Sequence, residues 1–430
     1  MPVILVKRIS EFENREVKIN GWIYNTRRKG KIGFLILRDG TGLVQCIVVR
    51  DDIGVDRYDE FKKLTQESSI SVSGLVVAND RAPGGYELQL RSFTVHHETV
   101  DYPITPKEHG TEFLMNHRHL WLRSRRQQAI LKIRHEIIKA VRDFFDSNDF
   151  TLVDTPILTP NAAEGTTTLF ETEYFGEKAY LCQTGQLYGE ANAMAFHRQY
   201  NFGPTFRAEK SKTRRHLIEF WMVEPEMAYC DLDENIVWAE KMIEFVVQRV
   251  LENRQTELTV LERDISMLEK IKAPFPRVSY TECVELLQKG GFDFKFGEDF
   301  GSPEETHISE QYGLPVVVHR FPAVIKAFYM TRDPENPDLV MGMDILAPEG
   351  YGEIIGGSER EPDYDLLVER IKAENLPLED FEWYLDLRRY GSVSHAGFGM
   401  GIERMVAWVC KLPHIRESIP YPRMLGRIRP

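Results

Sequence analysis

Residues 206–226 read FRAEKSKTRRHLIEFWMVEPE, a run that mixes cations, aromatic rings and spaced carboxylates. Its informative side chains are Arg207, Glu209, Arg214, Arg215, His216, Phe220, Trp221, Glu224 and Glu226. The planar fork of donors on arginine suits phosphate oxygens, and an aromatic face can stack on a base. Neither GxxxxGKS/T nor a helix-opening GxGxxG occurs in the chain, so the two common glycine-loop phosphate sites are excluded. The run therefore indicates a nucleotide site rather than the solvated helix or hairpin that charges alone would suggest.

Two further runs lie on either side of this one. DFTLVDTPIL at 149–158 has Pro156 closing a strand after a helix, and GFGMGIERMV at 397–406 is rich in glycine. In this order the three runs resemble motifs 1, 2 and 3 of the class II aminoacyl-tRNA synthetases, in the aspartyl/asparaginyl/lysyl subgroup. Matches at GKIGFLILRDGTGLVQ, EGTTTLF, GEIIGGSER and IPYPRML extend the resemblance over essentially the whole chain, and within the subgroup they imply an asparaginyl enzyme.

The composition sets broad limits on the protein. A chain of 430 residues suggests two or three domains, and 42% hydrophobic with 28% charged residues is ordinary for a soluble globular protein. No apolar run reaches the length of a membrane helix, and the N-terminus does not read as a signal peptide. The five cysteines form no CxxC pair, which argues against a zinc site or a disulfide framework and favours the cytoplasm.

The net charge of −12 is unevenly distributed. Residues 25–38 and 113–135 carry several arginines and lysines and no acid, whereas acids gather at 51–60 and 298–310. Basic patches on an acidic body are compatible with one specific tRNA and disfavour indiscriminate binding, so no DNA partner is expected.

Residues 1–100 are predicted to form five short strands with one helical insert at 51–67, and the Asp-Gly-Thr-Gly turn at 39–42 is a strong hairpin signal. We expect a small oligonucleotide-binding β-barrel, with an unrelated β-sandwich as the alternative. Residues 101–122 read as a hinge-like linker, and 123–430 as the catalytic domain.

Within the second domain, Ile130, Ile133, Ile137, Val141 and Phe144 recur at helical spacing and predict a helix of some 20 residues that stops at 147–149. Further helices are expected near 231–253 and 362–376. Because strands and helices do not alternate regularly, the sheet should be mostly antiparallel and the fold class α+β.

The resemblance implies a reaction in which an amino-acid carboxylate attacks the α-phosphorus of ATP, after which the acyl group passes to the terminal ribose of tRNA. It places Arg207 on the α-phosphate, Glu209 on the adenine amino group and Phe220 beneath the adenine. It also assigns to the ATP site Arg215, His216, Leu217, Glu353, Gly401 and Arg404, the last on the γ-phosphate. Taken alone, GFGMGIER is as readily a glycine-rich strand-to-helix turn.

Mg²⁺ on the phosphates is the implied metal, since it keeps its waters and needs few protein ligands. Glu353 is the first candidate ligand and Asp344 the second; otherwise the two are strand-edge acids. Gly356 stands where the family often has serine.

The implied amino-acid site contains Glu164, Gln186, Arg207, Glu224 and Arg360. Aspartyl relatives carry a lysine where this chain has Gly189, and Glu190 follows. Glu224 should accept from an asparagine amide and repel aspartate, Arg360 should donate to the amide oxygen, and Glu164 should meet the α-ammonium unless it only caps a turn.

Two positions depart from the family. Glu359 stands where glutamine is common and is expected to neutralise the neighbouring Arg360 in part, and Ser394 replaces a usual proline.

In the barrel, the resemblance implies that Phe34 stacks on the central anticodon base while Arg27 and Gln45 hydrogen-bond to bases. A buried core phenylalanine is the plainer interpretation of Phe34.

The hypothesis is therefore a cytoplasmic homodimer that joins L-asparagine to tRNA(Asn) with ATP, its interface formed by helix 127–146 and the strand ending at Pro156. An aspartyl enzyme, including one that charges both tRNAs, stays open. A tRNA-independent paralogue that amidates an aspartyl-adenylate is disfavoured by the intact barrel. An RNA-binding module with an inactive catalytic domain is disfavoured by the presence together of Arg207, Glu209, Glu353 and Arg404.

Overall fold

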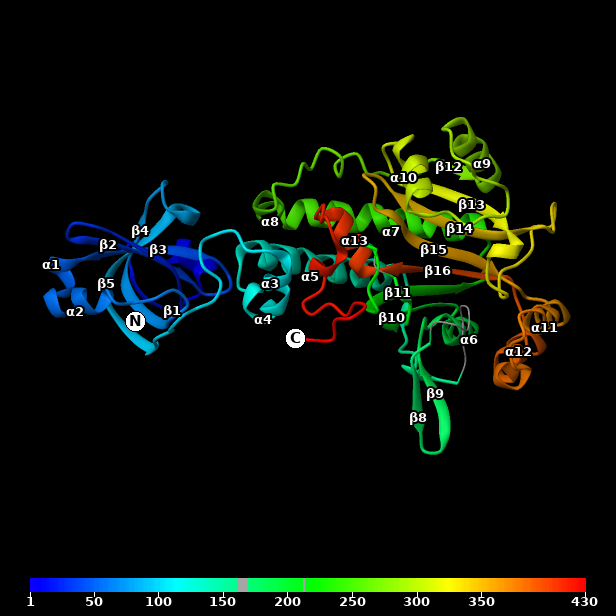
Figure 1. Cartoon of the computed structure of the whole chain (residues 1–430), viewed down its shortest axis with the longest axis horizontal. Coiled ribbons are helices and arrows are strands. Elements are labelled where there is room, and N and C mark those ends of the chain that lie inside the picture. Colours follow the sequence, from blue (N-terminus) through cyan, green and yellow to red (C-terminus); the bar gives the residue numbers. More distant parts are fainter. Residues whose placement is uncertain (161–168, 212) are drawn as a thin grey trace. The chain divides into compact units, whose positions relative to one another are not determined.

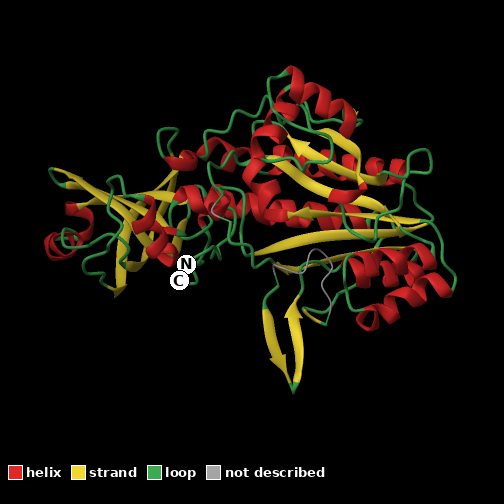
Figure 2. Cartoon of the chain, turned by 45° about the vertical axis from the view of Figure 1, so that its right-hand side comes forward, coloured by secondary structure: helices red, strands yellow, loops and turns green. Residues whose placement is uncertain are grey.

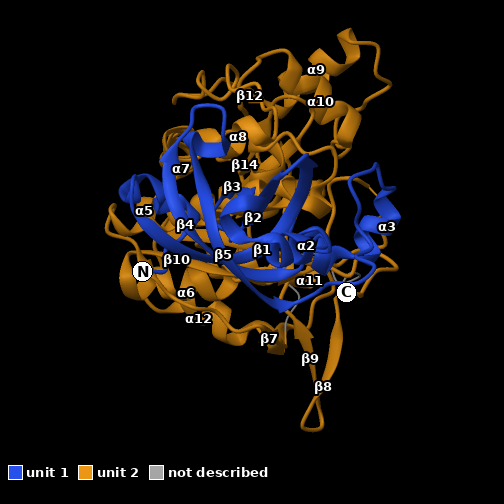
Figure 3. Cartoon of the chain, turned by 90° about the vertical axis from the view of Figure 1, so that its left-hand side faces the viewer, with its two compact units in different colours: residues 1–123 blue, residues 124–430 orange. Residues whose placement is uncertain are grey.

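The structure is a computed structural model, described over residues 1–160, 169–211 and 213–430. The chain divides into two compact units, Met1–Arg123 and Ser124–Pro430 (Figure 3). Each unit has a hydrophobic core of its own. None of the helices in the described ranges is both long and apolar enough to cross a membrane.

The first unit contains a closed five-stranded barrel of strand order β1-β2-β3-β5-β4, as predicted. Its strands and helices are β1 (Glu16–Lys29), β2 (Ile32–Arg38), β3 (Leu43–Val49), α1 (Arg50–Ile53), α2 (Val55–Phe61), β4 (Ser69–Ala78), β5 (Tyr86–His97), α3 (Thr111–Asn116) and α4 (Arg118–Trp121). Alternate residues of β1 to β3 are buried, because successive side chains of a strand point to opposite faces. The turn between β2 and β3 places Gly40 at φ +87°, a conformation that favours glycine.

An eight-stranded sheet forms the centre of the second unit (Figure 1). Its order is β12-β13-β14-β15-β16-β11-β10-β6, and only the β12–β13 and β10–β6 pairs are parallel. The prediction of a mostly antiparallel sheet is confirmed. The strands are β6 (Thr151–Leu152), β10 (Arg198–Phe206), β11 (Glu219–Ala228), β12 (Arg277–Ser279), β13 (Val316–Pro322), β14 (Leu339–Ala347), β15 (Gly352–Arg360) and β16 (His395–Gly401).

Two long helices, α5 (Arg125–Asp146) and α7 (Leu232–Asn253), pack against each other, and α7 crosses one face of the sheet. The Ser124 side chain caps α5 by accepting from the Gln127 amide at 3.3 Å. Isoleucines at helical spacing bury one side of α5 in the main core. The helix predicted from residue 125 thus begins and ends as expected. The prediction of a strand that ends at Pro156 is wrong: β6 ends at Leu152, because its pairing with β10 covers only Thr151 and Leu152.

The remaining elements surround the sheet. A small sheet of order β7-β9-β8 carries a hairpin that extends away from the large sheet (Figure 2). The bounds are β7 (Leu158–Thr159), β8 (Glu171–Tyr174), β9 (Glu177–Leu181), α6 (Gln186–Phe196), α8 (Gln255–Val260), α9 (Tyr280–Lys289), α10 (Ser302–Glu310), α11 (Tyr364–Ala373), α12 (Glu382–Arg389) and α13 (Ile402–Val409).

The side chains of β11 alternate between the two faces of the sheet. Val223 and Met227 point into the core shared with α5 and α7. Met222, Glu224 and Glu226 line a cavity on the opposite face. The alternation of side chains along this strand therefore creates both the packing surface and the wall of the site.

Candidate active site

One cavity of the second unit brings together all nine residues that were expected to bind ATP. They are Arg207, Glu209, Arg215, His216, Leu217, Phe220, Glu353, Gly401 and Arg404. They come from the loop that follows β10, from β11, β15, β16 and α13, and so from chain segments up to about two hundred residues apart. Their convergence gives the cavity cations, carboxylates and an aromatic ring.

A cation and an aromatic ring lie side by side in this cavity. Arg207 follows β10 directly, and its backbone N–H donates to the Ile218 carbonyl at 2.9 Å. The guanidinium carbon of Arg207 lies 5.6 Å from the centroid of the Phe220 ring. This arrangement suits a ligand with a flat base and an adjoining phosphate.

Arg404 and Glu353 meet on the far side of the cavity. Nη1 of Arg404 donates to the Glu353 carbonyl at 2.7 Å and to its Oε2 at 3.2 Å. Burial alone would raise the pKa of Glu353, but the charges of Arg404, Lys326 and Arg207 outweigh it and lower that pKa. Glu353 is therefore an ionised carboxylate among three cations.

Helix α10 contributes residues that sequence reasoning missed. Arg215 donates to Glu305 Oε2 at 2.7 Å, to Thr306 Oγ1 at 3.0 Å and to the Gly350 carbonyl. Burial, followed by the charge of Glu353, raises the pKa of Glu305 to about 7. Nothing in SPEETHISE distinguishes Glu305 from its neighbours, because only the fold brings it to Arg215.

Two carboxylates on neighbouring strands could hold a cation. Glu353 on β15 and Asp344 on β14 both line the adjoining cavity, and Lys326 Nζ lies 2.7 Å from Asp344 Oδ2. A Cβ at Gly356 would lie 3.0 Å from Glu353 Oε1 and 3.5 Å from Asp344 Oδ1, so this glycine lies between them. The described residues contain no cluster of three or more such ligands. Two carboxylates fit Mg²⁺ that is held mainly by substrate phosphates.

The expected amino-acid residues Gln186, Arg207, Glu224 and Arg360 line a cavity of about 600 Å³. Arg207 and Glu353 line this cavity as well as the first one, so the two adjoin. A ligand held in one cavity would therefore lie next to a ligand held in the other. Glu164 lies outside the described residues.

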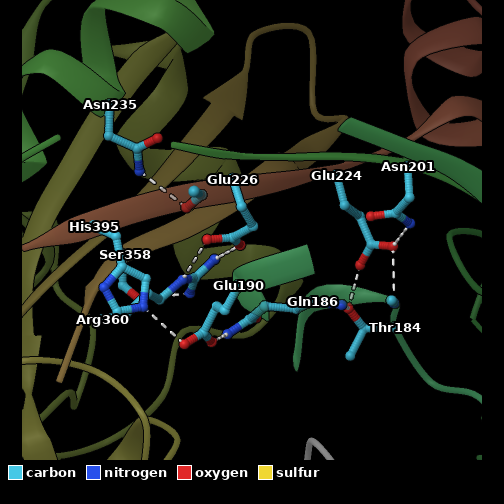
Figure 4. Close-up of polar contacts among 12 residues, drawn as sticks. Thr184, Gln186, Glu190, Asn201, Glu224, Glu226, Asn235, Ser358, Arg360 and His395 are labelled. Atoms are coloured by element: carbon cyan, nitrogen blue, oxygen red, sulfur yellow. Dashed lines mark hydrogen bonds and ion pairs between the residues drawn. The ribbon is translucent and has the colours of Figure 1, made fainter. Parts of the chain in front are cut away.

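Glu224 is held by three donors of the protein. Oε2 accepts from the Gly185 amide at 3.0 Å and from Asn201 Nδ2 at 2.7 Å, and Oε1 accepts from the Thr184 hydroxyl. The residue is 4% exposed. Figure 4 shows this group separate from the one around Arg360.

Arg360 is paired with Glu226, not with Glu359. Its Nε and Nη2 donate to the two carboxylate oxygens of Glu226, at 3.2 and 2.5 Å, and Nη1 donates to Ser358 Oγ at 2.7 Å. The Glu359 carboxylate instead accepts from Ser394 Oγ at 3.0 Å and from the Leu232 amide at 3.3 Å. The expectation that Glu359 neutralises Arg360 is wrong, because adjacent residues of a strand point to opposite faces.

Gly189 is enclosed. A Cβ at this position would lie 2.9 Å from Gln199 Nε2 and 3.1 Å from Glu226 Cγ. A side chain here would therefore press on Gln199 and on Glu226, the partner of Arg360. Packing, as well as charge, therefore disfavours a lysine at Gly189.

On the barrel, the three residues expected to read bases lie together. Arg27 of β1 is opposite Phe34 of β2, and its guanidinium carbon lies 4.5 Å from the Phe34 ring centroid. Arg27 Nη2 donates to Gln45 Oε1 at 3.3 Å. Phe34 is half-buried, in contrast to the buried residues on either side of it. The cluster offers a ring face, a cation and an amide at one surface.

The two basic segments are less exposed than their composition suggests. Arg38 is buried and pairs with Glu67 at 2.8 Å, and Arg134 is buried and pairs with Glu403 at 2.7 Å. Arg118 is fully buried. The cationic surface of residues 25–38 is therefore confined to the exposed Arg27, Arg28, Lys29 and Lys31.

The chain is similar to known proteins over its whole length. Residues 110–425 match the family model of the tRNA synthetases class II (D, K and N), and residues 17–95 match that of the OB-fold nucleic acid binding domain. The chain is 59% identical to an asparagine–tRNA ligase of Desulforamulus reducens, over 99% of both chains. It is 57% identical to that of Pelotomaculum thermopropionicum, over 100% of both.

Solved structures have the same fold. Asparaginyl-tRNA synthetase from Pyrococcus horikoshii, complexed with asparaginyl-adenylate, matches with a TM-score of 0.97 and 43% identity over 99% of each chain. A putative aspartyl-tRNA synthetase from Leishmania major matches with a TM-score of 0.87 and 25% identity, over 100% of this chain and 95% of that one. The chain belongs to the class II tRNA synthetases of the D, K and N group.

Proposed function

We propose that this chain is an asparagine–tRNA ligase, which activates L-asparagine with ATP and transfers it to tRNA(Asn). The observation that carries the choice of amino acid is the charge of the cavity wall. Arg360 is paired with Glu226, and Glu224 adds a second carboxylate. A neutral amide, which both donates and accepts, fits this wall better than an aspartate carboxylate, which only accepts. The relatives from D. reducens and P. thermopropionicum bear the same activity in their names.

In the first step a carboxylate oxygen of asparagine attacks the α-phosphorus of ATP, a P–O bond forms, and pyrophosphate leaves. The chain contributes positioning and charge stabilisation. Arg207 holds the α-phosphate at the junction of the two cavities, and Arg404, Arg215 and His216 face the outer phosphates. The adenosine is held by Glu209, Leu217, Phe220 and Gly401.

Class II synthetases use ATP with a divalent metal ion, and we assign Mg²⁺ to Glu353 and Asp344. When bound, the ion neutralises charge on the phosphates. Lys326, at 2.7 Å from Asp344, supplies a fixed positive charge beside the same pair.

Asparagine itself is held by its two ends. Glu224 accepts from the amide N–H, and Arg360 donates to the amide oxygen with an N–H that Glu226 and Ser358 do not use. Gln186 and Arg207 line the same cavity, and Glu164 is assigned to the α-ammonium.

In the second step a hydroxyl of the terminal ribose of tRNA attacks the acyl carbon, and AMP leaves. We assign anticodon binding to the barrel of residues 1–100, with Phe34 stacking on a base and Arg27 and Gln45 reading base edges. Residues 101–122 are the linker, and residues 123–430 form the catalytic domain.

We further propose a cytoplasmic homodimer that uses helix 127–146 and the extended segment that ends at Pro156. Support comes from Ile157 and Leu158, which follow Pro156 directly and are 44% and 41% exposed. Sedimentation of the purified chain tests the dimer.

The deciding experiment is ATP–pyrophosphate exchange with asparagine and aspartate side by side. Asparagine should be strongly preferred. A preference for aspartate would establish the aspartyl alternative, and release of free asparagine from aspartate and ammonia without tRNA would establish the amidating one.

A further inference from the structure

A buried polar cluster lies directly behind the amino-acid cavity. At its centre is Glu190, which is 0% exposed. Its oxygens accept from Tyr384 Oη at 2.8 Å, Arg388 Nη2 at 2.8 Å, His395 Nε2 at 2.9 Å and Gln186 Nε2 at 3.2 Å. Figure 4 shows Glu190 between His395 and Gln186, beneath Arg360.

The sequence builds this cluster from two pairs at helical spacing. Gln186 and Glu190 are four residues apart on α6, and Tyr384 and Arg388 are four residues apart on α12. Residues at this spacing lie on one face of a helix. The two helix faces meet, and His395, the first residue of β16, completes the cluster on the side of the sheet.

A fully buried carboxylate is costly unless donors and a counter-ion compensate for its lost hydration. Burial alone would raise the pKa of Glu190, but the charge of Arg388, the contact with His395 and the charge of Arg360 lower it. Four donors thus hold Glu190 as an anion, and one of them, Gln186, lines the cavity.

Two residues connect Glu190 to the ligand. Gln186 and Arg360 line the cavity, whereas Glu190 does not. A carboxylate only accepts, so the Gln186 amide must present Nε2 to Glu190. The Gln186 oxygen is then the amide atom that can accept from a substrate donor.

Each arginine behind the cavity is paired with a carboxylate. Arg360 is paired with Glu226, and Arg388 with Glu190, at 2.5 and 2.8 Å. If Glu190 were neutral, two arginines behind one wall would share a single carboxylate. The surplus positive charge would then be available to the carboxylate of aspartate.

We propose that Glu190 is a positioning residue that sets the discrimination between asparagine and aspartate, by neutralising the arginines behind the cavity and by fixing the Gln186 amide. This inference rests on the proposed function and deepens it. It assigns part of the selectivity to a side chain that never touches the amino acid.

The test is Glu190→Gln, with kcat/KM for asparagine and for aspartate measured by tRNA-free ATP–pyrophosphate exchange. We expect the asparagine-to-aspartate ratio to fall about tenfold. A unit charge within roughly 12 Å contributes at least this factor at an effective dielectric constant of about 20. Glu190 lies within that range of any ligand touching Gln186, since one hydrogen bond separates the two residues.

Three further variants separate charge from shape. Glu240→Gln removes another buried carboxylate, on α7 and bonded to Arg277 and the Phe275 amide, and should leave the ratio unchanged. Glu190→Asp keeps the charge and should keep the ratio even if rates fall. Arg388→Gln leaves the Glu190 charge in excess, so the ratio should rise; this variant carries the test if E190Q does not fold.

The outcomes distinguish the role of Glu190 from the proposed asparagine–tRNA ligase activity. A wild type that prefers asparagine, with an unchanged ratio in folded E190Q or in R388Q, overturns the role of Glu190 alone. An equal fall in E190D and E190Q shows that shape matters and also overturns it. A wild type that prefers aspartate overturns the proposed function itself.

Discussion

Replacing Glu224 by glutamine keeps the shape of the side chain and removes its charge. The variant should fold, because glutamine can keep its oxygen on the Gly185 amide and Asn201 Nδ2 and turn its NH2 toward Thr184. The Thr184 hydroxyl already accepts from the Gln186 amide at 3.0 Å and has a second lone pair for this donor. The acceptor that changes into a donor is therefore the one on the Thr184 side.

The size of the effect follows from the contacts of Glu224. A carboxylate offers about four acceptor positions, and the protein fills three of them, so about one is left for the substrate amide. Losing a hydrogen bond to a charged group costs about 1.5–3 kcal/mol, or about 10- to 150-fold in kcat/KM for asparagine. For aspartate, like charges about 4 Å apart repel by about 4 kcal/mol at an effective dielectric constant of about 20, and this repulsion disappears.

The assay is ATP–pyrophosphate exchange without tRNA, with initial rates for both amino acids in the wild type and Glu224→Gln. The asparagine-to-aspartate ratio should fall at least about tenfold. Thermal unfolding checks the fold, and Glu240→Gln controls for the loss of a buried carboxylate. A folded variant with the wild-type ratio would refute the assignment of Glu224, and a wild type that prefers aspartate would refute the asparagine interpretation.

Three other changes probe separate parts of the molecule. Phe34→Ala should weaken tRNA charging about 5- to 150-fold and spare ATP–pyrophosphate exchange, since one stacked base contributes about 1–3 kcal/mol. An equal loss in the two assays would show that Phe34 is a core residue. Phe93→Ala, in the barrel interior, is the control for that behaviour. Arg404→Ala should abolish exchange in a folded protein, and near-normal exchange would remove Arg404 from the site. Burial and Arg416 lower the pKa of His414 to about 4, so its contribution to stability is present above pH 6.5 and is lost as the pH falls toward 4. The melting temperature of His414→Gln should depend less on pH in that window, and identical slopes would contradict this.

Local patterns predicted the parts of the structure that depend on neighbouring residues. The turn at 39–42 fixes the register of β2 and β3. The turn at Gly30 and Lys31 pairs Lys29 with Ile32, and this register of β1 and β2 brings Arg27 opposite Phe34. The spacing of isoleucines and the stop at 147–149 determined α5 in the same way. In each case the decisive interactions span at most about twenty residues along the chain.

Contacts between distant segments could not be predicted in this way. Glu305 on α10 reaches Arg215, and Glu226 reaches Arg360, because the sheet brings their segments together. The wrong assignment of Glu359 to Arg360 treated adjacency in sequence as proximity in space. A strand assignment for GEIIGGSER would have excluded it, since alternate residues face opposite sides.

The choice between asparagine and aspartate depends on a sum of charges rather than on one residue. Arg360 could bind either side chain, and its net effect is set by Glu226, 134 positions earlier in the chain, and by Glu190 behind it. Inserting a lysine at Gly189 would therefore not add a simple cation. Its Cβ would press on Glu226 Cγ at 3.1 Å and could move the partner of Arg360. A gain of aspartate activity in Gly189→Lys would thus mix two causes, whereas Glu190→Gln changes the charge balance at constant shape.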